Sequence, residues 1–150
     1  MDRYRSLGIR RMSLGDTVGV ANPRQIYDTI SWMLDRYPDV EFTLHLHNTR
    51  DMALANVVAA MQAGMTRFDG AIGGLGGCPY APGATGNVST EDLVYMLSEM
   101  GVDTGVDIDK LIAVSRLLQV AVPHKLDSAL LKAGKRTDLK PAPKAQEKIG

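Results

Sequence analysis

The sequence predicts an α/β fold built on a parallel sheet. Three strand-like runs, "IRRMSLGDT", "EFTLHLH" and "TRFDGAIGG", end near Asp16, His47 and Gly73, which are 31 and 26 residues apart. Helical patterns lie between these runs, and strand–helix alternation at this spacing is typical of βα units. Two architectures fit, a doubly wound sheet and a (β/α)8 barrel. Both place their chemistry at the carboxyl ends of the strands.

The first helix is expected in "NPRQIYDTISWMLDRYP". Asn22 is its N-cap, Pro23 its first residue, and Gln25 completes a capping box. The second helix is expected in "RDMALANVVAAMQAG" and should end at Gly64. The apolar stripes of the two helices are Ile26, Ile30, Met33 and Leu34, and Leu54, Val57, Val58 and Met61.

Two further helices are expected in "STEDLVYMLSEMG" and "DIDKLIAVSRLLQVA". Ser89 or Thr90 caps the first of these, Gly101 ends it, and the second is amphipathic. We therefore assign residues 1–123 to the folded domain. From His124 onward there are seven Lys or Arg against three Asp or Glu, so residues 124–150 are expected to form a basic, flexible C-terminal segment.

Composition excludes several classes of protein. The chain has 150 residues, 45% of them hydrophobic, which suits one core. A formal net charge of zero gives no support for nucleic-acid binding. No run of eighteen apolar residues is present, so we expect no membrane span. A single cysteine excludes an internal disulfide and fits a reducing compartment.

His45 and His47 are the sharpest local signal. Residues i and i+2 of a strand point to the same side, so the two imidazoles should lie together at a strand end. They are two of only three histidines in the chain. The pair therefore indicates a site for one metal ion, and the alternative is two unrelated polar residues at a strand end.

Asp16 and Asn87 each allow two interpretations. Asp16 ends the first strand, where its carboxylate either takes part in catalysis or caps the following turn. Asn87 either offers an amide oxygen to a hard cation or caps a turn. Two imidazoles with oxygen ligands suit Mn²⁺ or Mg²⁺ better than a structural zinc site, since no thiolate cluster is available.

The segment "GGLGGCPYAPGATGN", residues 73–87, holds six glycines, two prolines and the only cysteine. Such a stretch forms neither helix nor strand readily, and a loop of this length is usually functional. Cys78 on this loop could serve as an acid, a nucleophile or a redox-sensitive thiol.

The segments "SLGDTVGVANPRQ", "LHLHNTRDMALANVVAAMQAG", "FDGAIGGLGGCPYAPGATGN" and "STEDLVYMLSEMGVDTGVD" resemble 3-hydroxy-3-methylglutaryl-CoA lyases. These enzymes belong to the metal-dependent, aldolase-like TIM-barrel superfamily. The resemblance covers residues 5 to about 120, and its most specific part is the "CPYAPGA" core of the loop. The condensing enzymes of the superfamily share the H-x-H strand but carry a different segment in place of the loop.

The resemblance implies a function and a set of site residues. His45, His47 and Asn87 match metal ligands, Cys78 the catalytic loop cysteine, and Asp16 an active-site aspartate. The implied reaction cleaves (S)-3-hydroxy-3-methylglutaryl-CoA to acetyl-CoA and acetoacetate. His45 or Asp16 would take the hydroxyl proton, and Cys78 would protonate the departing enolate. The implied partners are an acyl-CoA substrate and a second copy in a homodimer, and the implied location is cytoplasmic in a bacterium or mitochondrial in a eukaryote.

The chain is too short for the whole barrel, which needs about 250 residues. By resemblance it supplies the C-terminal half, strands 5–8, with a short eighth strand near residues 86–88 and an extra C-terminal helix. The family's first strand, with its Arg-Asp-Gly segment, a metal-ligating Asp and a catalytic Arg, has no counterpart here. We therefore expect open sheet edges, one uncovered apolar face, and an isolated chain that dimerises or aggregates with little activity. A lyase for a longer acyl-CoA, a non-catalytic remnant and a half that pairs with a separate N-terminal chain are the alternatives.

Overall fold

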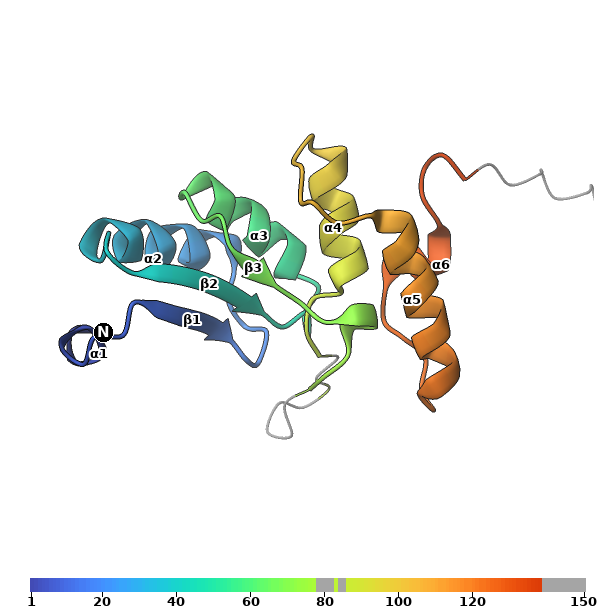
Figure 1. The fold of residues 1–150 in the computed structure, drawn as a ribbon, viewed down its shortest axis with the longest axis horizontal. Coiled ribbons are helices and arrows are strands. Elements are labelled where there is room, and N and C mark those ends of the chain that lie inside the picture. Colours follow the sequence, from blue (N-terminus) through green and yellow to red (C-terminus); the bar gives the residue numbers. More distant parts are fainter. Residues whose placement is uncertain (78–82, 84–85, 139–150) are drawn as a thin grey trace, which may run out of the picture.

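The computed structural model describes residues 1–77, 83 and 86–138, and shows a parallel sheet with helices on one of its faces (Figure 1). The three strands are β1 (Arg11–Asp16), β2 (Glu41–Leu46) and β3 (Phe68–Asp69). The helices are α1 (Asp2–Ser6), α2 (Pro23–Arg36), α3 (Ala53–Gln62), the short 3-10 helix η1 (Ile72–Gly74), α4 (Thr90–Glu99), α5 (Ile108–Ala121) and α6 (Ala129–Ala133). The predicted α/β class and parallel sheet are confirmed.

The sheet has the order β1-β2-β3, and both pairings are parallel. The strand expected near residues 86–88 does not form. Instead, Asn87 makes an isolated bridge to His47, and Ser89 makes another to Ala71. The reason is local, because α4 begins at residue 90, directly after these bridges, and leaves no length for a ladder.

α2 and α3 pack side by side on one face of the sheet and enclose the core with it. The capping box predicted at the start of α2 is confirmed: the Asn22 side chain accepts from the backbone N–H of Gln25, and the Gln25 side chain accepts from that of Asn22. Strand β2 alternates exposed and buried positions, and its buried side chains, Phe42, Leu44 and Leu46, point toward the helices.

The buried face of α3 differs from the predicted stripe. Only Val57 of the four predicted residues is fully buried, and the least exposed residues of α3 are Ala53 and Ala60. Because α3 lies against α2 and the sheet at once, small side chains face the crowded side. The larger side chains of the stripe, Leu54, Val58 and Met61, lie half-buried at its border.

The face of the sheet opposite α2 and α3 is polar. Strand alternation and register bring together on it Arg11, Ser13, Gly15, Glu41, Thr43, His45, Arg67 and Asp69. Glu41 of β2 forms ion pairs of 3.1 Å with Arg11 of β1 and with Arg67, the residue before β3. The expected uncovered apolar face is therefore wrong. The polar side chains on this face of the sheet are typical of the lining of a binding or catalytic site and not of a hydrophobic core.

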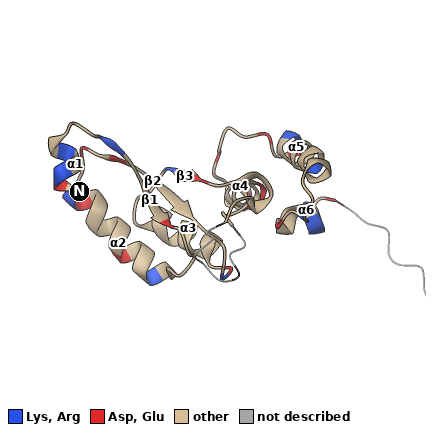
Figure 2. Ribbon diagram, turned by 90° about the horizontal axis from the view of Figure 1, so that it is seen from below, with Lys and Arg blue, Asp and Glu red and all other residues tan. Residues whose placement is uncertain are grey.

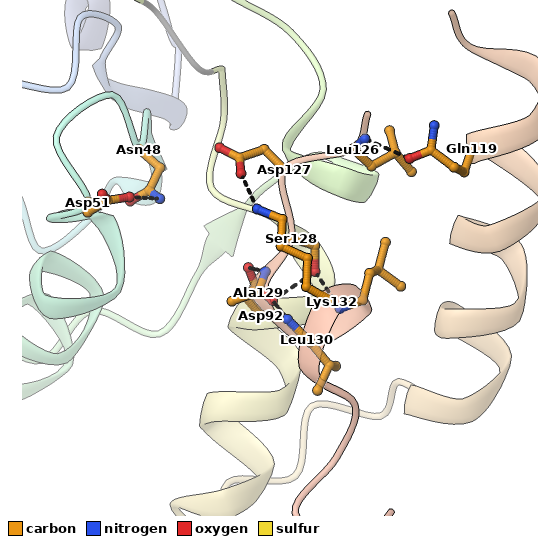
Figure 3. Close-up of polar contacts among 11 residues, drawn as sticks. Asn48, Asp51, Asp92, Gln119, Leu126, Asp127, Ser128, Ala129, Leu130 and Lys132 are labelled. Atoms are coloured by element: carbon orange, nitrogen blue, oxygen red, sulfur yellow. Dashed lines mark hydrogen bonds and ion pairs between the residues drawn. The ribbon is translucent and has the colours of Figure 1, made fainter. Parts of the chain in front are cut away.

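Helices α5 and α6 both pack against α4, which precedes them in the chain (Figure 3). Asp92 of α4 accepts hydrogen bonds from the Ser128 hydroxyl and from the backbone N–H groups of Ala129 and Leu130, at 2.7–2.9 Å. These bonds satisfy the free donors at the start of α6. The N–H of Asp127 donates to the carbonyl of Gly73 at 2.8 Å.

The expectation of a flexible segment from His124 onward does not hold for residues 126–133. Leu126 is 3% exposed and lies so close to Gly73 that a Cβ at position 73 would meet its side chain at 2.7 Å. The polar and basic composition hid this packing, because the buried residues in the described range 124–138 are two leucines and one serine: Leu126, Ser128 and Leu130.

α5 packs against α4 and α6 and leaves Val114, Leu117 and Val120 exposed. Among the described residues, none of the helices has both the length and the apolar character needed to cross a bilayer. Lys and Arg are distributed from α1 at one end of the molecule to α5 and α6 at the other (Figure 2).

The packing of residue 126 predicts a clear stability difference. Leu126→Ala is expected to lower the free energy of unfolding by about 2–5 kcal/mol, because it empties a buried site. The matched control is Leu117→Ala on α5, where the leucine is 74% exposed and the change should stay within about 0.5 kcal/mol. Urea denaturation followed by circular dichroism measures both. Equal stability of the two variants would contradict the docking of this segment.

Candidate functional site

The parallel register places the candidate residues at one end of the polar face. Gly15 of β1 pairs with His45 of β2, and His45 pairs with Asp69 of β3. Directly paired residues of neighbouring strands project to the same side. A Cβ at residue 15 would meet the His45 ring at 4.0 Å and the Thr17 methyl group at 3.3 Å, so glycine keeps the space beside the imidazole open.

His45 and His47 lie together, as their spacing predicts. Their ring centroids are 5.3 Å apart and the rings are inclined by 60°. His45 is partly exposed, with 31% of its side-chain surface accessible, and its Nδ1 lies 2.5 Å from Oδ1 of Asp69. His47 is buried and has no hydrogen-bond partner at Nδ1 in the described part of the chain.

Burial lowers the pKa of His47 below the ordinary value for imidazole. The neighbouring His45 lowers it further, and Asp16 raises it. Burial is the largest of these effects, since it penalises the charged ring. A ring kept neutral retains a lone pair for a cation, which suits ligation.

Asn87 is joined to His47 by the antiparallel bridge between their backbones. Its side-chain nitrogen donates to the carbonyl of Leu75 at 2.7 Å, which fixes the direction of the amide. Its Oδ1 is buried and accepts no hydrogen bond from the described residues. A buried carbonyl oxygen with no partner is costly unless something else satisfies it.

These observations fit a divalent cation. His47 has an unused ring nitrogen and Asn87 an unused amide oxygen, both buried and on adjacent backbone segments. In the described ranges, no three or more His, Cys, Asp and Glu side chains are grouped to hold a metal ion. The described residues therefore offer two imidazoles and one amide, which is part of a coordination sphere.

Asp16 is engaged by the loop that follows β1. Its Oδ1 accepts from the N–H of Val20 at 3.1 Å and its Oδ2 from the N–H of Ala21 at 2.9 Å. Of the two interpretations of this residue, the structure supports the turn-capping one. Its catalytic role stays a prediction.

Cys78 lies outside the described residues, but both ends of its loop are visible. At the first end, Glu91 is fully buried and both of its carboxyl oxygens accept from the N–H of Gly73, at 2.8 and 2.9 Å. The Ser89 hydroxyl donates to the same carboxyl group at 2.8 Å. At the second end, Gly86 lies against the backbone oxygens of Gly74 and Gly76. The two ends are thus held together beside Asn87.

Sequence reasoning missed two residues of this region. The sequence places Asp69 inside a strand, as either a buried partner or an edge residue, and predicts no role for it, although its register position could have been found by aligning the ends of the second and third strands. Glu91 looked like an ordinary acidic residue in the first turn of a helix, and nothing in the sequence distinguishes it from Asp92. Its burial depends on η1 lying over α4.

Comparisons with known proteins assign the chain to a family. The model of the HMGL-like family matches residues 1–118, and the chain belongs to that family. A hydroxymethylglutaryl-CoA lyase of Bacillus subtilis is 48% identical over 85% of this chain and 43% of its own length. An (R)-citramalyl-CoA lyase of Chloroflexus aurantiacus is 47% identical over 85% of this chain and 40% of its own length.

A solved structure of an HMG-CoA lyase from Acinetobacter baumannii, in complex with coenzyme A and 3-methylmalate, is 50% identical. It superimposes with a TM-score of 0.89 over 95% of this chain and 47% of its own. The chain thus spans less than half the length of the relatives it matches.

The crowding at Gly86 predicts that this glycine is essential for the loop ends. Gly86→Ala is expected to cost about 1–3 kcal/mol more than Gly101→Ala, because overpacking adds to the backbone strain. Both residues have positive φ, of 100° and 79°, but a Cβ at residue 101 meets nothing within 4 Å. The variants thus share the cost of a left-handed residue, about 1–2 kcal/mol. Urea denaturation compares them, and equal losses would contradict the steric argument.

Proposed function

We propose that this chain forms the metal-binding half of a hydroxymethylglutaryl-CoA lyase, which cleaves (S)-3-hydroxy-3-methylglutaryl-CoA to acetyl-CoA and acetoacetate. One observation carries the proposal. His45 of β2, His47 directly after it and the amide of Asn87 lie at the carboxyl end of the sheet, with unused buried acceptor atoms on His47 and Asn87. The "CPYAPGA" loop and the identity to named lyases support the same reaction.

The proposed cofactor is Mg²⁺ or Mn²⁺, held by His45, His47 and Asn87. Such a cation supplies Lewis acidity toward the tertiary hydroxyl and a carboxyl oxygen of the substrate. The remaining ligands would come from outside the described residues. The carboxylate of the family's Arg-Asp-Gly strand is the candidate that the resemblance provides.

His45 is the better candidate for the base that takes the hydroxyl proton only if its free ring nitrogen is not bound to the cation, because one lone pair cannot serve as both ligand and base. Its ring lies on the polar face and is partly exposed. Asp16 is the other candidate, but both of its oxygens already accept bonds from the loop. Cys78 remains the proposed donor of the proton to the enolate of acetyl-CoA.

We also propose that β1, β2 and β3 are strands 5, 6 and 7 of a barrel, and that the bridges of Asn87 and Ser89 mark the eighth. The open edge of β1 supports this assignment. A groove of about 440 Å³ runs between β1 and α2, lined by apolar side chains that include Leu14, Ile26 and Met33. The first half of the barrel would cover it, either as part of the same polypeptide or as a separate chain. The homodimer of the family is proposed for the completed barrel.

A second candidate is a lyase for another 3-hydroxyacyl-CoA. It is favoured by one observation, the nearly equal identity to the citramalyl-CoA lyase, 47% against 48%. The two functions share the metal site and differ in the substrate pocket, part of which the first half would supply. A non-catalytic remnant is the third candidate.

The metal site is tested by titrating the chain with Mn²⁺ and detecting bound ion by electron paramagnetic resonance. His47→Ala is expected to weaken binding by at least about tenfold, since it removes a ligand from an incomplete set. His124→Ala is the matched control, because residue 124 is exposed in the loop between α5 and α6 and should bind as the wild type does. Equal binding by both variants would contradict the proposed site.

The reaction is tested by combining the chain with a first half-barrel that carries the Arg-Asp-Gly strand. Release of acetoacetate from 3-hydroxy-3-methylglutaryl-CoA, in excess over cleavage of citramalyl-CoA, is the expected result. Cys78→Ser should remove most of this turnover and leave Mn²⁺ binding intact, because the thiol is the proton donor and not a ligand. Preference for citramalyl-CoA would favour the second candidate, and no turnover of either substrate would favour the remnant. Unchanged turnover in the Cys78 variant would exclude its catalytic role.

A further inference from the structure

The two histidines of the site differ in their hydrogen-bond partners at Nδ1. Nδ1 of His45 lies 2.5 Å from Oδ1 of Asp69, whereas Nδ1 of His47 has no hydrogen-bond partner in the described part of the chain. An ionised carboxylate only accepts hydrogen bonds, so the shared proton must sit on Nδ1 of His45. In the neutral ring, Nε2 is then the nitrogen that carries the lone pair.

We propose that Asp69 is a positioning residue for His45, and that it fixes both the orientation of the ring and its Nδ1–H tautomer. The inference rests on the proposed function for its purpose, because the oriented Nε2 is the atom that ligates the cation or takes the substrate proton. A carboxylate behind a ligating histidine commonly has this effect on the ring.

The position of Asp69 is fixed from both sides. On one side, its strand pairs with β2 through only two residues, and one of the two pairs is His45 with Asp69. On the other side, Gly70 lies against the next backbone segment, where a Cβ would meet the carbonyl oxygen of Val88 at 2.8 Å. The backbone therefore fixes the Cα of Asp69 opposite His45, and the 45% accessible carboxylate reaches the imidazole through its hydrogen bond to Nδ1.

The same contacts explain why β3 is so short. After Asp69 the chain leaves β2, and Ala71 bridges Ser89 instead. A two-residue strand gives little stability to the sheet. Its main contribution is to place Asp69 opposite His45. This position distinguishes Asp69 from an edge carboxylate that only faces solvent.

The test uses Asp69→Asn in the 150-residue chain, with Asp35→Asn as the matched control at an exposed position on α2. The first readout is nuclear magnetic resonance of ¹⁵N-labelled imidazoles without metal, at about pH 8, where an ordinary imidazole is neutral. Wild type and the control should show His45 protonated at Nδ1. The Asp69 variant should shift this ring toward the Nε2–H form and leave His124 unchanged.

The second readout is Mn²⁺ affinity, which should fall by about 10- to 100-fold in the Asp69 variant and stay unchanged in the control. Two outcomes overturn the inference: a wild-type His45 that is protonated at Nε2, or a tautomer that the substitution does not change. Loss of Mn²⁺ binding in His47→Ala but not in Asp69→Asn would keep the metal site and remove the role of Asp69 in it. If the wild type binds no Mn²⁺, the proposed function fails, while the resonance experiment still decides how His45 is held.

Discussion

The parallel register of β2 with its two neighbours is the constraint on which the site depends. It sets His45 between Gly15 and Asp69, so that one side of the imidazole has open space and the other has a carboxylate. A slip of one residue would turn every side chain of a strand to the opposite face. Such a slip would bury His45 against α2 and α3 and expose Leu44 and Leu46 on the polar face. The hydrophobic alternation of β2 therefore determines both the core and the position of the imidazole.

A second set of contacts connects the site to the C-terminal region. The buried carboxyl group of Glu91 holds the N–H of Gly73, and the carbonyl of Gly73 is held in turn by the N–H of Asp127. Residues near the end of the chain thus stabilise the start of the glycine-rich loop. The side-chain N–H of Asn87 donates to the carbonyl of Leu75, so the position of this amide depends on the same start of the loop. The helices beyond α4 therefore contribute to the geometry of the site without reaching it.

Local signals in the sequence predicted the local structure well. The capping box at Asn22, the end of α3 near Gly64 and the proximity of His45 and His47 each depend on neighbours a few residues apart. Contacts between distant segments could not be predicted in this way. The burial of Leu126 depends on Gly73, and the pairing of Asp69 depends on the register of β3. The prediction of an uncovered apolar face failed for a related reason. Strand alternation shows which residues share a face of the sheet, but it does not show what covers that face.

The hydrogen bonds of Asp16 have a consequence for how substitutions at this position are interpreted. The carboxylate is the anchor of two consecutive backbone amides, Val20 and Ala21, and Ala21 also accepts a bond from the buried amide of Asn56. Any residue that removes the carboxylate also releases the turn that leads into α2. Loss of function in such a variant would report two causes at once, a missing acid–base group and a loosened turn. Kinetic measurements alone would not separate the two causes, because the same carboxylate is a candidate acid–base group and the hydrogen-bond acceptor that holds the turn.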